Sequence, residues 1–233
     1  MTYLNKFTTI LGEIGGNHNG DYETALALID TAKDAGCDYA KFQLYGSFKP
    51  EWIEPLKAYC KHKEIGFLAT AFNKESVDML GEVEMYKIAS PEGINRELVE
   101  YIIQKSGLKT VLISDGAGGG STAPNAFSLR CVSDYPANPE DYRLEDLNEK
   151  GFCGVSDHTT DYEIFPMMCV AAGARFIEKH FTLDKTQKGD DHPFALNPDE
   201  LKKFVENIRK AEKIVYGIHK IIPETREILW MKK

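Results

Sequence analysis

Two histidines end two short apolar runs of the chain. His158 closes the run Gly154-Val-Ser-Asp-His, and His180 closes the next such run, Phe176-Ile-Glu-Lys-His. If both runs are neighbouring strands of one parallel sheet, their imidazoles reach the same rim, where a divalent cation fits between them. Imidazole favours Mn²⁺, Fe²⁺ or Zn²⁺ over Ca²⁺, and two ligands leave positions open for substrate and water. The pair therefore predicts a metal site, and two hydrogen-bonded core histidines are the alternative.

Two lysines also end apolar runs, in a chain with a formal net charge of −8. Lys41 stands in Tyr-Ala-Lys-Phe-Gln and Lys87 in Met-Tyr-Lys-Ile-Ala-Ser. Two ammonium groups with hydroxyl donors nearby suit a ligand that carries a phosphate and a carboxylate. The hydroxyl residues at strand ends are Thr70, Ser90, Ser114 and Ser156. We therefore expect a small anionic substrate, and the alternative is that each lysine extends from its strand end into solvent.

Further polar residues end or follow the predicted strands, where a βα barrel has its ligand site. Glu13 would be costly to bury alone, so it either pairs with a lysine or serves in proton transfer. Asp191, after the eighth strand, either binds sugar hydroxyls or forms a turn. His18, after the first strand, either lines the same rim or stabilises its loop. The other candidates at this rim are Gln43, Glu92, Ser133 and Tyr135.

Eight β-type runs must position these residues, and they alternate with helical patterns along the whole chain. This alternation is typical of parallel strands joined by right-handed crossovers. The predicted strands are residues 8–13, 39–43, 66–70, 85–88, 110–114, 128–131, 152–155 and 175–179. Eight strands in 233 residues, of which 42% are apolar, predict an α/β protein with one TIM (β/α)8 barrel domain over residues 1–233.

The clearest helix is expected between the cap Asp21 and Gly36, with Ala25, Leu28 and Ile29 on one apolar face. Further helices are expected at residues 50–63, 74–80, 96–105, 141–148, 162–172 and 198–216. Pro166 lies beyond the first turn of its predicted helix and should bend it. Residues 115–127 are too rich in glycine for a helix, so we expect the barrel to lack one outer helix after the fifth strand.

The bulk composition excludes several classes of protein. A net charge of −8 and a pI near 5.3 exclude a general nucleic-acid binder, which needs a basic surface. The chain shows neither a signal peptide nor a membrane span, so we expect a cytoplasmic protein without membrane contact. The five cysteines are odd in number and form no CxxC pair, which predicts reduced, buried thiols. Residues 222–233 look like a truncated extension.

Seven short motifs resemble those of the sialic acid synthases, a family that includes legionaminic and pseudaminic acid synthases. They recur in order over nearly the whole chain, and the combination of Ser-Asp-His-Thr with Glu-Lys-His-Phe-Thr is far more specific than any one motif. The matching stretches are Glu13-Ile-Gly-Gly-Asn-His-Asn-Gly20, Ala40-Lys-Phe-Gln43, Phe67-Leu-Ala-Thr-Ala-Phe72, Tyr86-Lys-Ile-Ala-Ser90, Cys131-Val-Ser-Asp-Tyr-Pro136, Gly154-Val-Ser-Asp-His-Thr159 and Ile177-Glu-Lys-His-Phe-Thr182.

The resemblance implies a transferase that condenses phosphoenolpyruvate with an N-acyl hexosamine, typically N-acetylmannosamine, to a nine-carbon 2-keto acid and phosphate. It implies that His158 and His180 hold a divalent metal, Mn²⁺ with Mg²⁺ or Co²⁺ as alternatives, and that Glu13 transfers protons or orients the reactants. Residues implied to hold the phosphate and carboxylate are Lys41, Thr70, Lys87, Ser90, Ser114 and Ser156, and those implied to contact the sugar are Gln43, Tyr135 and Asp191.

The chain also departs from the family's pattern. Typical members have a longer loop after the second strand and a C-terminal antifreeze-like domain that supplies an arginine to the acyl-sugar pocket. We expect a compact form without either, which is a homodimer or depends on a partner for the missing domain. Ser133, Asp115 and Pro91 also stand where other residues are common. The alternatives are a catalytically idle, partner-dependent barrel that binds a small anion, and a metal-dependent sugar isomerase.

Overall fold

The computed structural model describes residues 7–116, 118 and 121–217. Eight strands form a closed barrel in which each strand pairs in parallel with its neighbours in the sequence and β8 pairs with β1. The strands are β1 (Thr9–Gly15), β2 (Tyr39–Gln43), β3 (Gly66–Thr70), β4 (Met85–Ile88), β5 (Thr110–Asp115), β6 (Ala126–Cys131), β7 (Gly154–Asp157) and β8 (Phe176–His180). The expected TIM barrel is confirmed.

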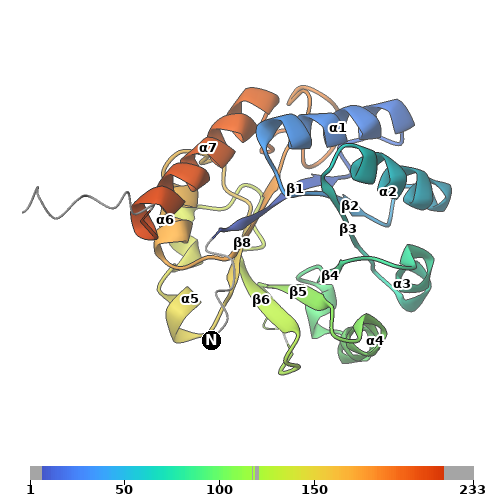
Figure 1. Cartoon of the computed structure of the whole chain (residues 1–233), viewed down its shortest axis with the longest axis horizontal. Coiled ribbons are helices and arrows are strands. Elements are labelled where there is room, and N and C mark those ends of the chain that lie inside the picture. Colours follow the sequence, from blue (N-terminus) through green and yellow to red (C-terminus); the bar gives the residue numbers. More distant parts are fainter. Residues whose placement is uncertain (1–6, 117, 119–120, 218–233) are drawn as a thin grey trace, which may run out of the picture.

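Helices cover the outside of the barrel (Figure 1). They are α1 (Tyr22–Ala35), α2 (Ile53–His62), α3 (Lys74–Leu80), α4 (Arg96–Ser106), α5 (Asp146–Glu149), α6 (Phe165–Ala171) and α7 (Pro198–Val215), with 3₁₀ turns η1 (Pro50–Trp52), η2 (Glu92–Ile94) and η3 (Pro139–Tyr142). The last helix packs against α6 and α1, next to the point where β8 closes on β1. Across the described ranges, no helix is both long and apolar enough to cross a bilayer.

The first helix forms where the sequence predicts it, for the expected local reasons. The Asp21 carboxylate accepts a hydrogen bond from the Thr24 backbone N–H at 2.8 Å, which satisfies an otherwise unpaired donor of the first turn. Its buried face includes Leu28 and Ile29. Gly36 ends the helix with a φ of 91°, a left-handed conformation that a residue with a side chain rarely adopts.

The connection between β5 and β6 differs from the others. Its described residues, 116, 118 and 121–125, contain no helix. Val111 still pairs with Ala126 and Asp115 with Arg130, so the strands lie in register without a covering helix. The predicted loss of one outer helix after the fifth strand is therefore borne out for the described part of this crossover.

Two helix predictions were wrong. A single helix over residues 141–148 does not form, because Arg143 has a positive φ of 47° and separates η3 from α5. Pro166 does not bend its helix, because α6 begins at Phe165 and the proline lies in the first turn. A first-turn proline removes no helical hydrogen bond and has a suitable φ, so it favours the start of the helix here.

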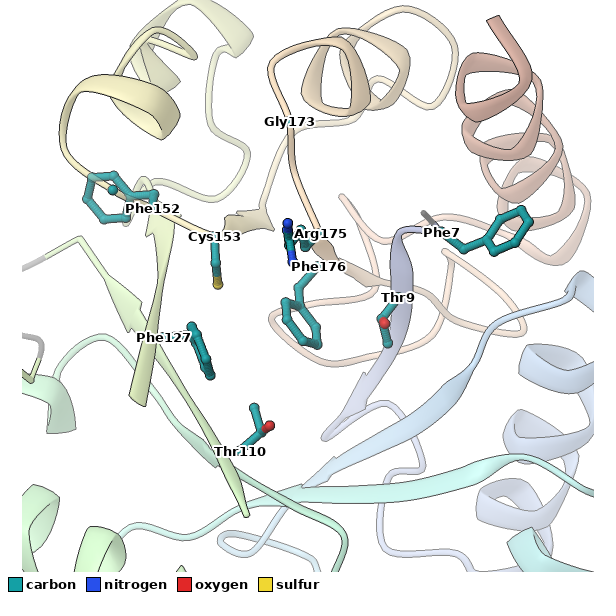
Figure 2. Close-up of a pocket in the computed structure, with 10 residues that line it drawn as sticks. Phe7, Thr9, Thr110, Phe127, Phe152, Cys153, Gly173, Arg175 and Phe176 are labelled. Carbon is teal, nitrogen blue, oxygen red and sulfur yellow. The ribbon is translucent and has the colours of Figure 1, made fainter. Parts of the chain in front are cut away.

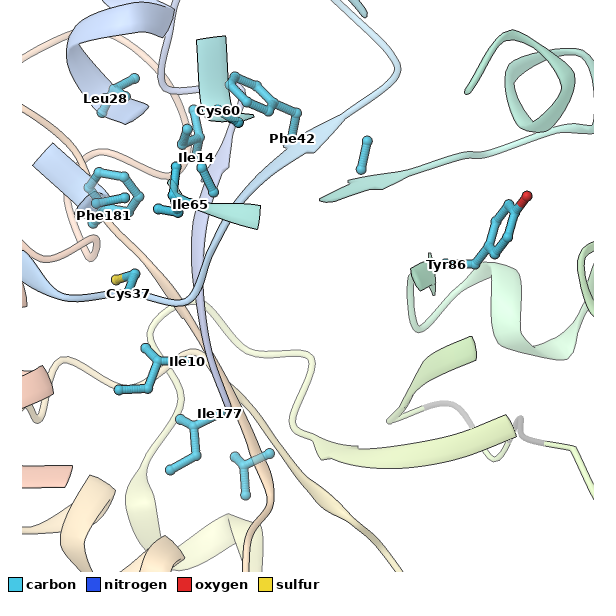
Figure 3. Packing of buried hydrophobic residues seen from close by; sticks show 14 of the residues in the cluster. Ile10, Ile14, Leu28, Cys37, Phe42, Cys60, Ile65, Tyr86, Ile177 and Phe181 are labelled. Atoms are coloured by element: carbon cyan, nitrogen blue, oxygen red, sulfur yellow. The ribbon is translucent and has the colours of Figure 1, made fainter. Parts of the chain in front are cut away.

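The apolar core has two parts. The larger part lies between the strands and the helices, where Figure 3 shows Ile10 and Ile14 of β1 with Leu28 of α1 and Phe181. A smaller cluster fills the inside of the barrel and consists of Leu11, Leu68, Met85, Leu112 and Leu129. We call this cluster the apolar plug. On β1 and β3 its residues precede the polar residues Glu13 and Thr70 by two positions, so these polar side chains lie directly above the plug inside the barrel.

All five cysteines are free thiols, as the sequence predicts. Cys37, Cys60, Cys131 and Cys169 are buried, and Cys153 is half-buried. Burial raises the pKa of Cys37 and of Cys60 to about 12. A thiol with so high a pKa is neutral at physiological pH, so these cysteines act as small apolar residues of the core.

Candidate active site

The strand register brings the predicted polar residues to one level at the carboxyl end of the barrel. Glu13 pairs in register with Lys41 on one side and with His180 on the other. Thr70 lies opposite Lys87, and Ser156 lies opposite Glu178. Because alternate residues of a strand point to the same face, these side chains share the inside of the barrel above the apolar plug.

Lys41 lies between two buried carboxylates. Its ammonium forms an ion pair with Glu13 and lies 3.7 Å from Glu178 Oε2, and Gln43 Nε2 donates to Glu13 Oε1 at 2.9 Å. Burial would lower the pKa of Lys41, but the two carboxylates outweigh it and raise that pKa. Burial also raises the pKa of Glu13, against the effect of Lys41. Glu13 is thus paired with a lysine and has a raised pKa, so the two sequence hypotheses for it are compatible.

Lys87 is the less compensated cation. It donates to Ser114 Oγ at 2.7 Å and lies 3.6 Å from Glu178 Oε2. Burial lowers its pKa, and the nearby ammonium of Lys41 adds to that effect against the carboxylates. An extra anion would be favourable here, because it would offset the cost of burying this positive charge.

Several buried polar atoms at this level have no hydrogen-bond partner among the described residues. They are Thr70 Oγ1, Glu92 Oε2, Glu178 Oε2 and His180 Nδ1. Buried polar groups without partners are uncommon in folded proteins, and each costs free energy unless a ligand or water pairs with it. Their concentration at one rim is typical of a ligand site.

The two histidines lie side by side, with ring centroids 5.6 Å apart. His158 Nδ1 lies 2.6 Å from the Val132 carbonyl oxygen, so the ring donates its proton there and its Nε2 keeps a lone pair. Burial lowers the pKa of His158 to about 3, which keeps the imidazole neutral. The Tyr135 ring stacks on His158 at 4.2 Å between centroids, so this half-exposed tyrosine covers the pair.

His180 differs from His158 in its charge environment. Its Nδ1 lies 3.4 Å from Asp191 Oδ2, within ion-pair range but without a well-formed hydrogen bond. Burial would lower the pKa of His180, but Asp191 outweighs that effect and raises it. With Nδ1 facing Asp191, the Nε2 atom is the nitrogen left for another ligand.

The geometry of this pair fits a metal with few protein ligands. Both rings have Nδ1 directed to an oxygen of the protein, which is the usual outer arrangement of metal-binding histidines. Across the described residues, no group of three His, Cys, Asp or Glu side chains lies together in a way that could hold an ion. A metal held at this pair would have the two imidazoles as protein ligands, with substrate or water in its other positions.

Two of the sugar-side candidates, Gln43 and Asp191, lie beside Gly15, the last residue of β1. A Cβ built on Gly15 would lie 3.1 Å from both Asp191 Oδ2 and Glu13 Oε1, and 3.6 Å from Gln43 Nε2. A pocket of about 180 Å³ opens outward from this point. Its lining residues are Gly16, Asn17, Tyr45, Gly46, Ser47, Gly189, Asp190 and Asp191. Asp191 thus belongs to both the inner site and the outer pocket.

Two predicted serines lie on the opposite side of the rim, beside Gly116. The Gly116 N–H donates to Ser90 Oγ at 3.0 Å, and a Cβ on Gly116 would lie 2.9 Å from Ser133 Oγ. Ser90 is buried but Ser133 is exposed. Ser133 therefore lies at the outer edge of the rim rather than inside the anion site.

His18 does not line the rim. Its ring is buried among Phe42, Phe48 and Trp52, and its Nδ1 accepts a hydrogen bond from the Gly20 N–H at 3.0 Å. Burial lowers its pKa, so the ring is neutral. Of the two roles considered for His18, the structure supports stabilisation of the loop after β1.

Sequence reasoning missed two residues that shape the site. Glu178 is buried inside the barrel, accepts a hydrogen bond from Ser156 Oγ at 3.1 Å and faces both lysines. Strand alternation was a usable signal for it, because a residue two before His180 must share its face. Tyr142 Oη donates to the Ser156 carbonyl at 2.9 Å and accepts from the His158 N–H at 2.7 Å. No local sequence pattern predicts this role for Tyr142, because its hydrogen-bond partners lie at the end of β7.

A cavity of about 580 Å³ lies at the opposite end of the barrel from these residues. Figure 2 shows it between the amino ends of the strands, where Thr9, Thr110 and Phe176 begin β1, β5 and β8. Four phenylalanines, two threonines and Arg175 are among the residues that line it. None of the predicted catalytic residues reaches it, and ligand sites of βα barrels lie at the carboxyl ends of the strands. This cavity is therefore not the candidate active site.

The sequence of the chain is similar to that of known proteins over most of its length. A model described as the NeuB family matches residues 46–220. Spore coat polysaccharide biosynthesis protein SpsE of Bacillus subtilis is 34% identical over 265 residues, which cover 92% of this chain and 70% of that protein. N-acetylneuraminate-9-phosphate synthase of Mus musculus is 32% identical and is matched over 88% of this chain and 70% of that protein.

A solved structure extends the likeness to three dimensions. The crystal structure of N-acetylneuraminic acid (sialic acid) synthetase from Leptospira borgpetersenii serovar Hardjo-bovis aligns with a TM-score of 0.84 and 30% identity. The alignment covers 100% of this chain and 94% of that chain. The two chains therefore share the same fold over the whole length of this chain.

Proposed function

Because the chain belongs to the NeuB family, we propose that it is a carbon–carbon bond-forming transferase that condenses phosphoenolpyruvate with an N-acyl hexosamine. The products are a nine-carbon 2-keto sugar acid and inorganic phosphate. Relatives and similar structures bear the names of sialic acid synthases, which supports this reaction class. We propose Mn²⁺ as the metal, on the chemistry of the two imidazole ligands.

One observation carries the proposal: two buried lysines with hydroxyl groups beside them lie at the same barrel end as two adjacent imidazoles. Lys41 and Lys87 share the Glu178 carboxylate, and Ser114 and Ser156 offer hydroxyl groups on either side. Phosphoenolpyruvate presents a phosphate and a carboxylate on a short rigid frame, so it matches two cations held a few ångströms apart. Its binding would also balance the buried positive charge of Lys87.

His158 and His180 are the residues that would hold the metal, through the two Nε2 atoms. When bound, such a cation would polarise the aldehyde oxygen of the open-chain sugar and lower the pKa of a coordinated water. The Val132 carbonyl and Asp191 hold the two rings in place from behind. Tyr135, stacked on His158, limits the access of solvent to this end of the site.

The proposed reaction balances with water as the only further reactant. C3 of phosphoenolpyruvate forms a bond to the aldehyde carbon, and the aldehyde oxygen becomes a hydroxyl group. The oxygen of water adds to C2, the bond from C2 to the phosphate oxygen breaks, and C2 becomes a ketone. Of the two water protons, one ends on the new hydroxyl and the other on phosphate. Glu13, whose pKa burial raises, is the side chain placed to move a proton between these oxygens.

The test is a turnover assay with purified protein, Mn²⁺, phosphoenolpyruvate and a panel of N-acyl hexosamines. We expect inorganic phosphate and a 2-keto acid to appear in equal amounts, and His158→Ala to abolish both. Lys87→Met should lower kcat/KM for phosphoenolpyruvate by about 100-fold or more, because it removes a buried charge that faces the ligand. Absence of turnover with every sugar of the panel would count against the proposal and favour a catalytically idle barrel that depends on a partner. Turnover by the isolated chain would exclude dependence on a partner.

A further inference from the structure

The cavity at the amino end of the barrel is lined by residues that the proposed reaction does not use. Its volume of about 580 Å³ lies within the range of small-molecule sites, roughly 300–1,000 Å³. Figure 2 shows Phe127 and Cys153 on one side of the opening and Thr9 and Phe7 on the other. The interior of a (β/α)8 barrel is normally filled with side chains, so an open space of this size at its amino end is unusual.

The apolar plug separates this cavity from the candidate active site. Thr9 lies two positions before Leu11 on β1, so both side chains share the inner face of the strand, with the threonine on the cavity side. Cys153 and Phe176 line the cavity and also pack against the plug. Because Leu11 is fully buried between the two ends, a ligand in this cavity would not contact the reactants at the other end.

Four phenylalanines line the cavity, and two of them remain exposed to solvent. Phe7 is 64% exposed and Phe127 is 40% exposed, whereas Phe152 and Phe176 are half-buried. A ligand with an apolar body would remove this aromatic surface from water, which is favourable. Aromatic rings also pack well on one another, with centroids roughly 4.5–7 Å apart. The lining therefore suits a ligand that carries an aromatic ring.

Arg175 is the one charged residue that lines the cavity in the described part of the chain. Its backbone is fixed, because its N–H donates to the Cys153 carbonyl at 2.7 Å and its carbonyl accepts from the Thr9 N–H at 2.8 Å. Within the described ranges, no carboxylate forms an ion pair with its guanidinium, unlike those of other arginines. Burial raises the pKa of Cys153 to about 12, and the nearby Arg175 charge acts in the opposite direction. A ligand that complements this cavity is therefore an anion.

We propose that this cavity binds a small aromatic carboxylate, with its ring against the phenylalanines and its carboxylate on the Arg175 guanidinium. A guanidinium presents two parallel N–H donors that match the two oxygens of a carboxylate. Inorganic phosphate or a sugar phosphate would leave the phenylalanines uncovered, so neither fits the whole lining. The site lies outside the proposed condensation reaction, and its ligand is neither substrate nor product of that reaction.

The experiment titrates the full chain with naphthalene-2-carboxylate and, separately, with naphthalene-2-carboxamide, which is neutral and has nearly the same shape. We expect calorimetry to show about tenfold tighter binding of the carboxylate, because only this compound makes a charge-assisted contact with Arg175. Arg175→Gln should remove this difference and leave the affinity for the carboxamide within about twofold. The matched control is Arg96→Gln, the same charge change at the exposed first residue of α4, which should leave both affinities unchanged.

Alkylation of Cys153 shows where the carboxylate binds. At ten times its Kd, naphthalene-2-carboxylate should slow the reaction of Cys153 with iodoacetamide by about tenfold, because the occupied cavity covers the thiol. Phosphoenolpyruvate should not protect Cys153, since its proposed site lies at the other end of the barrel.

Several results would overturn the proposal. Equal affinity for the two compounds, a difference that Arg175→Gln does not change, or no binding of either compound contradicts the role of Arg175. Binding that leaves the alkylation of Cys153 unchanged places the carboxylate elsewhere. Protection of Cys153 that rises with protein concentration in the absence of naphthalene-2-carboxylate assigns this end of the barrel to a second copy of the chain. All of these results leave the proposed function intact, because none of them involves turnover.

Discussion

The Glu178 Oε2 atom lies 3.6 Å from the Lys87 ammonium, inside a barrel where both side chains are almost fully buried. The same oxygen lies 3.7 Å from Lys41, so one carboxylate is shared between two cations. Burial alone would raise the pKa of Glu178, but the two lysines outweigh it and lower that pKa strongly. Glu178 is thus an internal counterion at the place where we propose that phosphoenolpyruvate binds.

Replacing Glu178 with glutamine should make the fold depend on an added anion. Glu178→Gln leaves two buried ammonium groups with one carboxylate fewer, and breaking a buried ion pair on one side typically costs roughly 3–5 kcal/mol. Phosphate or phosphoenolpyruvate should then raise the melting temperature of the variant more than that of the original protein. Thermal melts with and without each anion measure this.

The control for Glu178→Gln is Glu82→Gln, which removes an exposed partner of Lys109 and should change the melting temperature little. A Glu178→Gln protein that is as stable as the original, with the same response to phosphate, would contradict the role of Glu178 as a counterion.

Gly15 should not tolerate even a methyl group. Its φ of 54° is left-handed, which costs about 1 kcal/mol for alanine, and the added Cβ would lie 3.1 Å from Asp191 Oδ2 and Glu13 Oε1. We therefore expect Gly15→Ala to fold but to lose most of its turnover. Gly107→Ala is the matched control, because Gly107 has a similar φ of 61° at the end of α4 and nothing lies within 4 Å of its Cβ. Steady-state kinetics measure kcat and KM of both variants. Equal activity of the two would show that turnover does not require the absence of a side chain at Gly15.

The sequence predicts most of this architecture because its signals are local. Asp21 and Gly36 bound α1 through side-chain capping and a left-handed glycine, which depend only on nearby residues. The two His-ended runs lie on adjacent parallel strands, so their convergence follows from topology alone. The strand ends were displaced by up to two residues, as at β7, which runs over Gly154–Asp157 rather than 152–155.

What the sequence did not predict depends on contacts between distant segments. Arg143 interrupts the expected helix with a positive φ that its residue type does not announce. Asp191 lies in a loop after β8, and only the folded chain brings it to His180. Strand alternation places Glu178 on the same face as His180, but the sequence alone does not show that it faces both lysines. Lys179 in fact points outward, where it pairs with Asp157 at 2.8 Å.

The hydroxyl of Tyr142 should position His158. It bridges the Ser156 carbonyl and the His158 N–H, so Tyr142→Phe leaves a buried donor and a buried acceptor unpaired. The expected cost is about 1–3 kcal/mol of unfolding free energy, together with weaker metal binding as the end of β7 relaxes. Denaturant unfolding and Mn²⁺ titration by calorimetry test the two effects.

Tyr101→Phe is the control for this hydroxyl. Tyr101 of α4 donates a hydrogen bond to Asp78 of α3 at the protein surface. It should affect neither stability nor metal affinity measurably. If Tyr142→Phe lowers stability but leaves the Mn²⁺ affinity unchanged, Tyr142 supports the fold without positioning the histidine.

The cysteines should resist alkylation in the folded protein. Burial raises the pKa of Cys131 to about 11 and that of Cys153 to about 12, so few thiolates form at mildly alkaline pH. Cys153 is half-buried and lines the open cavity at the amino ends of the strands, so it should react first. Mass spectrometry after brief iodoacetamide treatment measures the order in which the cysteines are alkylated. Denatured protein is the fully reactive control. Fast reaction of Cys37 or Cys169 would show that the core opens more easily than the packing indicates.

Phosphoenolpyruvate affinity should fall at alkaline pH through the loss of one proton from Lys87. Burial lowers the pKa of Lys87 below its usual 10.5, whereas the carboxylates raise that of Lys41, so Lys87 loses its charge first. The charged form attracts the anion; KM for phosphoenolpyruvate should therefore rise by about tenfold per pH unit above the pKa of Lys87. The stability of the free protein changes with pH in the opposite direction. The unfolded lysine keeps its proton up to a higher pH than the folded one, so this group makes the free protein more stable as pH rises through that window.

The Lys87→Gln variant tests whether Lys87 causes this alkaline change. Without the ionising group, KM should be high at neutral pH and nearly flat through the alkaline window, and the stability gain should vanish as well. Burial raises the pKa of Tyr135 and of Cys131, so these two groups of the rim lose their protons at higher pH than Lys87. An alkaline rise of KM that persists unchanged in Lys87→Gln would assign the ionisation to another group and remove Lys87 from the anion site.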